Sequence, residues 1–257
     1  MTALNSARVP DLRPRRLAAL ARSEITLLVR NRAALSVALL MPVVMVLSLR
    51  FTLSSNGAAG LAEATLTGGI GMVLLMVVYM NLVSAYVARR EELVLKRLRT
   101  GEAGDLEILA GTALPAAVLA LAQIAGLAVA GAAVLHVRGP QNPAVLALGV
   151  LAGILLLAGL AALTSAFTRN VESAGLTTLP LFLASVIGSG LFVPVDSLPD
   201  ALARAAELLP LSGVMALVRA GWLGGDAELL VPAATTLAWI ALTVFAVRRW
   251  FRWEPRR

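Results

Sequence analysis

The stretch AVLALGVLAGILLLAGLAALTSAF, residues 144–167, contains no charged residue. A transmembrane α-helix needs about 20 consecutive, mainly apolar residues, and this stretch meets that length. In hydrocarbon a helix pairs its backbone N–H and C=O groups within the segment, whereas an open strand leaves them unpaired. The stretch therefore predicts a membrane-spanning helix.

Five further runs of comparable composition lie on either side of this stretch. They cover about Ala33 to Leu53, Leu66 to Ala88, Leu106 to Leu135, Ala174 to Val195 and Leu229 to Val247. Of the 257 residues, 59% are hydrophobic and only 14% are charged, which is more apolar surface than a soluble core of this length could bury. We predict an all-α, polytopic membrane protein whose six transmembrane helices lie within residues 33–250.

The basic residues are divided unevenly between the segments that join the six runs. If the six runs cross the membrane, only four of the 22 Lys and Arg residues fall on one side of it: Arg50, Arg138, Arg204 and Arg219. The others fall on the opposite side, in the N-terminal region, in two loops, and in the basic tail at 251–257 or just before it. Basic segments stay in the cytoplasm, so both termini are predicted to be cytoplasmic. The net charge of +7 is then a topology signal, and no nucleic-acid partner is needed to explain it.

The N-terminal region, residues 1–32, contains a basic amphipathic pattern. At helical spacing its leucines fall on one face and arginines such as Arg30 on the opposite face. This pattern predicts a helix that lies along the inner membrane surface, in contact with lipids. Glu24 projects from the apolar face, either to pair with a nearby arginine or to contact another element at the cytoplasmic rim.

The stretch RREELVLKRLRTGEAGDLEIL, residues 89–109, holds five basic and five acidic residues between two apolar runs. Its first part, about 89–105, is the main predicted cytoplasmic loop. Acidic residues precede basic ones along a helical pattern, which suits the helix dipole, and leucines between them offer apolar surface. Two interpretations stay open: a docking surface for a partner, and a solvated loop that serves only topology.

The segment between the last two runs, about 196–225, contains two short amphipathic patterns. Pro199 suits the first turn of one helix and Pro210 ends it, while the second runs from about Ser212 to Leu223. Neither is long enough to span a bilayer. We predict short outer-leaflet helices that dip into the membrane edge or cap the bundle.

An enzymatic function finds no support in the sequence. The single lysine, Lys96, does not stand in a Gly-Lys-Ser/Thr phosphate loop, and the single histidine, His136, has no second metal ligand nearby. The chain has no cysteine. We therefore predict no catalytic residues, no metal site and no cofactor in this chain.

Uncharged polar residues within the runs are the candidates for a substrate path. Most such groups serve helix packing, as does the small-residue pair Gly149 and Gly153. The candidates are Asn81, Ser173, Thr177, Thr178, Ser185 and Ser189.

Four stretches carry a resemblance that covers nearly the whole chain. They are RSEITLLVRNR at 22–32, REELVLKRLRT at 90–100, the long stretch TRNVESAGLTTLPLFLASVIGSGLFVPVDSLPDAL at 168–202, and LLPLSGVMALVRA at 208–220. Their order resembles the ABC-2 type permease family, the membrane subunit of bacterial ABC exporters, with daunorubicin-resistance-like members. The resemblance implies a plasma (inner) membrane location and a separate ATP-binding subunit that holds ATP and Mg.

The resemblance also implies that the loop at 89–105 forms a coupling helix in a cleft of that ATP-binding subunit. Glu24 and Arg30 would lie on the N-terminal helix that flanks it. The implied partner-binding residues of the coupling helix are Glu91, Glu92, Leu95, Lys96, Arg97, Leu98 and Arg99.

The predicted function is that of a permease subunit for ATP-driven export of a hydrophobic drug, peptide or lipid. Six spans are half of what a transport path usually needs, so a homodimer or a heterodimer with a homologous permease should enclose the path. One alternative is a polysaccharide or glycolipid exporter permease, which the scarcity of aromatic residues in the spans disfavours. Another is a secondary transporter that works without an ATPase, which the lack of charges inside the spans disfavours.

Overall fold

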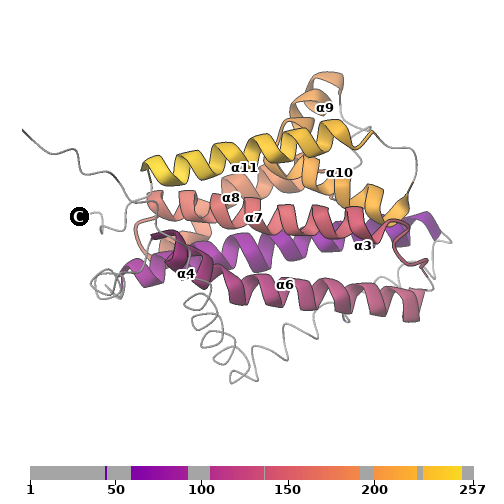
Figure 1. Cartoon of the computed structure of the whole chain (residues 1–257), viewed down its shortest axis with the longest axis horizontal. Coiled ribbons are helices and arrows are strands. Elements are labelled where there is room, and N and C mark those ends of the chain that lie inside the picture. The colour runs from indigo at the N-terminus through magenta and orange to yellow at the C-terminus, as the bar shows by residue number, and fades with distance from the viewer. Residues whose placement is uncertain are drawn as a thin grey trace, which may run out of the picture.

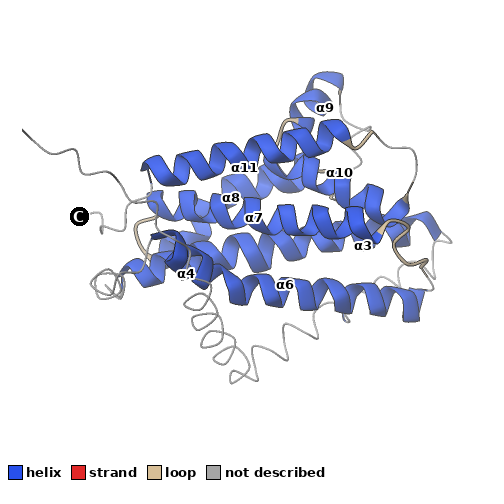
Figure 2. Ribbon diagram, viewed as in Figure 1, coloured by secondary structure: helices blue, strands red, loops and turns tan. Residues whose placement is uncertain are grey.

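The computed structural model describes residues 44, 59–91, 105–135, 137–191, 199–224 and 228–250. Within these ranges every regular element is a helix, and the long helices run side by side in one bundle (Figures 1 and 2). Three predicted features lie outside the described residues: the N-terminal helix with Glu24 and Arg30, the first span apart from Val44, and the loop residues Glu92 to Arg99.

Five helical segments in the described ranges are long and apolar enough to cross a membrane. They correspond to the last five runs predicted from the sequence. Their bounds are Thr65–Glu91, Ile108–Leu135, Pro143–Phe167, Val171–Gly188 and Leu230–Arg249. The number becomes six if a bent pair of short helices, described below, is one broken span.

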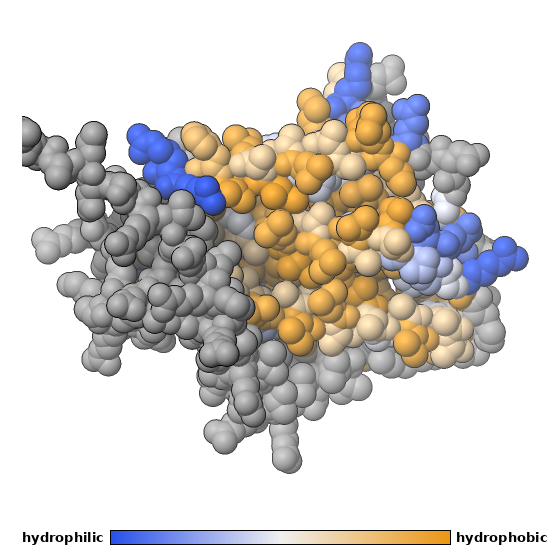
Figure 3. Space-filling view, viewed as in Figure 1, coloured by the Kyte–Doolittle hydropathy of each residue, from blue (hydrophilic) through white to orange (hydrophobic). Residues whose placement is uncertain are grey.

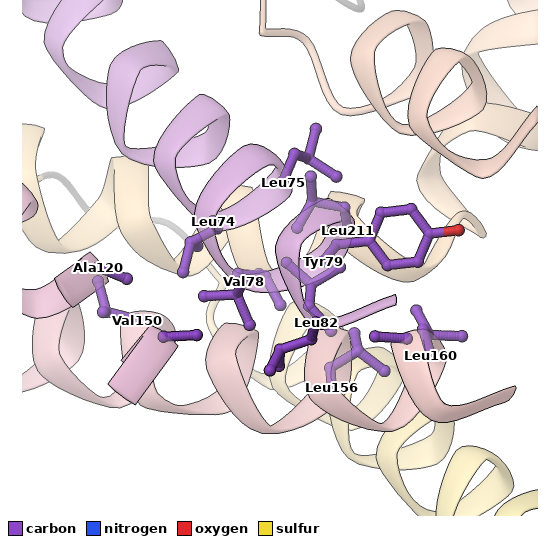
Figure 4. Close-up of a cluster of buried hydrophobic side chains, with 14 of the residues drawn as sticks. Leu74, Leu75, Val78, Tyr79, Leu82, Ala120, Val150, Leu156, Leu160 and Leu211 are labelled. Carbon is purple, nitrogen blue, oxygen red and sulfur yellow. The ribbon is translucent and has the colours of Figure 1, made fainter. Parts of the chain in front are cut away.

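The first of these segments is a continuous helix of three parts. Helix α3 (Ala59–Val73) leads into a π-helical turn, η1 (Leu74–Met80), and then into α4 (Asn81–Glu91). The Asn81 N–H donates to the carbonyl of Met76, five residues earlier, which is the bond that defines a π-helix. Side chains of η1 are buried against α7 at the centre of the core, as Figure 4 shows for Leu74, Val78 and Tyr79.

Three long helices complete most of the bundle: α6 (Asp105–Leu135), α7 (Pro143–Phe167) and α11 (Leu230–Trp250). Helix α7 lies in the middle, in contact with α4, η1 and α11. Pro143 occupies the first turn of α7, where its missing N–H breaks no helical bond, and the Asn142 side chain caps the helix. Pro115 lies inside α6 and does not end it, as predicted for a membrane helix.

Helix α8 (Val171–Gly188) is shorter at its C-terminal end than predicted. The sequence suggested a span to Val195, but the helix stops at Gly188 with Ser189 as its C-cap. Gly190 has a φ of 69°, a left-handed conformation that ends a helix and that glycine adopts without a steric penalty. The predicted end of this span was too far along the chain because the residues after Gly188 are also mainly apolar. Hydropathy does not detect the left-handed backbone conformation at which the helix ends.

The predicted outer cap contains two short helices, α9 (Asp200–Glu207) and α10 (Pro210–Leu223), bent by 83° from one another. Helix α9 projects from the bundle (Figure 1), and Leu202 within it and Leu208 at its C-cap are exposed. Helix α10 instead packs between α7, α11 and α3, and most of its side chains are buried. Within the chain α10 is therefore a part of the bundle core rather than a surface layer.

Small residues make the close contact between α7 and α10 possible. A Cβ atom added at Gly149 would lie 3.0 Å from the Leu217 Cβ, and one added at Gly153 would lie 2.8 Å from Val214 Cγ1. Gly221 of α10 faces the backbone of Leu146 in the same way. The predicted packing role of Gly149 and Gly153 is confirmed, and the facing helix is α10.

The outside of the described bundle is apolar over its middle. In Figure 3 hydrophobic residues cover the central part of the visible face, and hydrophilic residues gather at its ends. Leucines on α7 and α8 are more than half exposed, among them Leu148 at 66% and Leu176 at 73%. Such a surface suits hydrocarbon and not water, so the fold is that of a multi-pass membrane protein.

Candidate functional site

One end of the bundle gathers most of the charged residues of the candidate spans. Helices α4, α7 and α11 finish there and α8 begins there, on the left of Figure 1, and the segment 92–104 joins α4 to α6 from this end. We call it the loop end. Glu91, Glu172, Arg248 and Arg249 are exposed at the ends of their helices.

Arg90 at the loop end is different because it is only 5% exposed. Its Nη1 donates to the carbonyl of Ser165 at 2.7 Å. Its Nη2 donates to the carbonyl of Thr168 and, at 3.1 Å, to that of Arg169. One guanidinium group of α4 is thus hydrogen-bonded to one carbonyl group in the last turn of α7 and two in the turn between α7 and α8.

The position of these carbonyls explains why a positive charge is stable there. The last four C=O groups of an α-helix have no partner within the helix, and the Ser165 carbonyl belongs to this last turn of α7. The carbonyl end of a helix also carries a partial negative charge of about half an electron. The Arg90 guanidinium donates hydrogen bonds to these oxygens and is attracted by their partial negative charge. These interactions offset the desolvation cost of burying the guanidinium.

The α7–α8 turn is itself held together by side chains. The Thr168 hydroxyl lies 2.9 Å from the Thr164 carbonyl and 2.8 Å from the Thr177 hydroxyl of α8. Asn170 and Ser173 form a capping box, in which each side chain bonds to the backbone N–H of the other residue. The turn and the first two turns of α8 are consequently one hydrogen-bonded unit.

This unit contains two of the residues predicted for the substrate path, Ser173 and Thr177. Thr178, Ser185 and Ser189 are buried further along α8, where the hydroxyls of Thr178 and Ser189 donate to carbonyls of their own helix. The structure does not bring Asn81 to this group, because it is exposed at the start of α4.

A cavity of about 430 Å³ extends from the loop end along the bundle. It lies between α6, α7 and α11, and Tyr86 of α4 also lines it. Alanines, leucines and valines, such as Ala113, Leu155 and Val244, form its wall. The Tyr86 hydroxyl donates to the Leu109 carbonyl at 3.2 Å, so this polar group is already paired. This cavity, called the groove below, offers a ligand many apolar contacts and few polar contacts.

A second cavity, of about 370 Å³, lies near the α9–α10 bend and has a different chemistry. Glu207, Arg219 and Glu228 line it together with Ser212 and Thr235. The Arg219 guanidinium donates to the Ser189 carbonyl at 2.9 Å. The two cavities therefore present an apolar wall near the loop end and a charged wall near the α9–α10 bend.

Arg90 was not among the predicted site residues, although the sequence contains a signal for its burial. Leu82, Tyr86 and Arg90 recur every fourth residue, so they share one helix face, and the first two are buried apolar residues. The partners of Arg90 are backbone carbonyls 75 to 79 residues away, which no local pattern reveals.

Comparison with known proteins identifies the family. A search of curated proteins gives no match to the chain. A family model described as ABC-2 type transporter matches residues 15–223, which include α3 to α10. The chain therefore belongs to the ABC-2 type transporter family, and as such it is a membrane permease, the component of an ABC-type transporter that has no ATPase of its own.

Proposed function

We propose that the chain is the permease of an exporter that moves a hydrophobic drug, peptide or lipid across the bacterial plasma membrane. A separate ABC subunit binds and hydrolyses ATP with Mg, and it docks on the loop that follows Glu91. The observation that supports an apolar cargo is the 430 Å³ groove, whose wall is almost entirely aliphatic. A sugar polymer would favour aromatic faces for stacking, and Tyr86 is the one aromatic residue in this wall.

We further propose that two permease chains enclose the path, as a homodimer or with a homologous partner. The groove is partly open to the side of the single bundle, where Leu151 and Leu155 are more than half exposed. A second chain or lipid must complete such a wall. Ser173 and Thr177 lie near the loop end, and the proposal assigns them to the inner mouth of the path.

Transport in vesicles tests this function. The permease and its ATPase are reconstituted, and ATP-driven movement is followed for a neutral lipophilic dye (N-phenylnaphthylamine), a fluorescent phospholipid and a hydrophobic peptide. We expect ATP-dependent export of at least one of the three. Movement of a soluble oligosaccharide alone would contradict the apolar cargo, and transport of any probe without the ATPase would favour a secondary transporter.

A substitution that fills the groove should lower transport and leave ATPase docking unchanged. Ala113→Trp places an indole in the apolar wall, eight residues beyond the start of α6 at Asp105, and we expect it to lower export several-fold while ATPase co-purification is unchanged. Ala125→Trp is the matched control, because Ala125 is exposed on the same helix and outside the groove. Equal transport by both variants would show that the cargo does not pass along this wall.

The loop end is proposed to face the cytoplasm, with both chain termini on that side. Arg248 and Arg249 at the end of α11 and Arg89 near the end of α4 supply positive charge there. At the C-terminus, a reporter that works only in the cytoplasm should be active. Near Gln141, a reporter that works only outside the cytoplasm should be active. The opposite result at either site would invert the proposed topology.

A further inference from the structure

We infer that Arg90 is a positioning residue that transmits movement of the ATPase-docking loop to the α7–α8 turn and so to helix α8. This inference rests on the proposed function, because it assumes that an ATPase acts on the loop. It adds the connection by which that action reaches the spans. Among the described residues, the Arg90 side chain offers this connection through its hydrogen bonds.

The position of Arg90 along the chain supports the inference. Arg90 is the last residue but one of α4, so only Glu91 separates it from the segment 92–104 on which a partner would act. Its neighbour Glu91 is exposed, whereas Arg90 is buried between helices. A displacement of the loop that tilts the end of α4 must therefore move the Arg90 guanidinium.

The bonding of Arg90 decides what moves with it. The guanidinium is planar and presents its donors in a fixed fork, so two of its nitrogens hold three carbonyl oxygens in one arrangement. These oxygens belong to both the end of α7 and the turn that starts α8. A shift of the guanidinium either pulls the turn or breaks these bonds.

The turn passes the displacement to α8 and not only to α7. Thr168, whose carbonyl accepts from Arg90, is also in hydroxyl contact with Thr177 of α8 at 2.8 Å. Asn170 and Ser173 fix the direction of the first turn of α8 through their capping box. Helix α8 also contacts α4 directly.

A purely structural role is the competing explanation, in which Arg90 caps α7 and nothing more. The two explanations differ in what a variant loses. A cap contributes to stability in every state, whereas a transmission element is needed for transport per ATP hydrolysed. The decisive comparison is therefore between variants that assemble with the ATPase and hydrolyse ATP.

The test uses Arg90→Gln, Arg90→Lys and the control Arg169→Gln in the reconstituted permease–ATPase complex. Arg169 has an exposed side chain in the same turn, so its replacement removes a positive charge and keeps the backbone carbonyl that Arg90 binds. For Arg90→Gln we expect co-purification and ATP hydrolysis close to the parent but about tenfold less transport of N-phenylnaphthylamine or fluorescent phospholipid per ATP, a size typical of coupling between sites. Arg90→Lys keeps the charge but not the fork, so its transport per ATP should be intermediate.

A distance measurement covers the case in which the Arg90 variants do not fold. The chain has no cysteine, so spin labels can be placed at chosen pairs of introduced cysteines in an otherwise native sequence. Labels at Ala88 of α4 and Leu176 of α8 should keep their separation between nucleotide-free and ATP-bound states, while the separation of Leu176 from Leu237 of α11 changes. These labels leave the arginine and its three acceptors intact.

Each outcome has a distinct meaning. Transport per ATP in Arg90→Gln equal to that in Arg169→Gln, or a change in the separation of Ala88 and Leu176 during the ATP cycle, overturns the inference. A parent complex without any ATP-driven transport contradicts the proposed function, and the inference falls with it. Reduced transport per ATP with intact assembly, or a constant separation beside a changing one, supports it.

Discussion

Gly221→Leu will destabilise the bundle by about 3 kcal/mol or more, since overpacking a core costs about 1–3 kcal/mol even where side chains can adjust. At Gly221 the obstacle is backbone, because an added Cβ would lie 2.7 Å from the Leu146 Cα and in contact with the Leu146 N atom. The α6–α7 loop is bonded at the same place, where the Asn142 N–H donates to the Gly221 carbonyl at 2.9 Å. Helix α10 can therefore accept a larger residue only by separating from α7.

The measurement is the unfolding midpoint in detergent, compared with that of Gly126→Leu. Gly126 lies in α6, and an added Cβ there would meet no atom within 4 Å. The unfolding midpoint of this control should match that of the parent or exceed it slightly, since glycine inside a helix costs about 0.5–1 kcal/mol of stability relative to alanine, and leucine is a good helix former. If Gly221→Leu unfolds at the same denaturant concentration as the control, the packing of α10 against α7 is not what holds the bundle.

The double variant Lys96→Glu and Arg97→Glu will separate the permease from its ATPase. The proposal places these charges in a complementary cleft, where juxtaposed like charges cost several kcal/mol, so affinity should fall by at least about 30-fold, or about 2 kcal/mol. Transport should be lost with it. Affinity is measured by titrating the ATPase onto permease in nanodiscs.

The matched control is Arg248→Glu and Arg249→Glu. It reverses two exposed basic residues at the same end of the bundle, outside the loop. Protease protection first establishes that both double variants insert in the parent orientation. Equal ATPase affinity in the two would mean that the charges of the loop serve topology alone, which is the interpretation that the sequence left open.

The sequence predicted the five spans that the structure describes well, because hydropathy measures the property that the membrane selects. The runs around Leu66 to Ala88, Leu106 to Leu135 and Ala144 to Phe167 correspond to helices of similar bounds. The end of the fifth run was wrong, because Gly190 changes the direction of the backbone within a sequence that remains apolar.

Features that depend on long-range contacts were predicted less well. Helix α10 has the short amphipathic pattern of a surface cap, yet it is buried because glycines on both sides allow a close approach to α7. The sequence shows that Arg90 belongs to the charged stretch at 89–109. The burial of Arg90, however, depends on backbone carbonyl groups far along the chain. A sequence pattern reports the polarity of one helix and not the shape of the helix that faces it.

The π-helical turn at Leu74–Met80 sets an insertion and deletion constraint on the chain. A π-helical turn accommodates an additional residue relative to an α-helix, and each residue of an α-helix rotates its successors by about 100° around the axis. Loss of one residue here would rotate α4 relative to α3 and turn Tyr86 and Arg90 away from their carbonyl partners, although no functional side chain had been replaced. We therefore expect the length of this segment to be constrained separately from its composition, so that natural variation within it consists of substitutions rather than gaps.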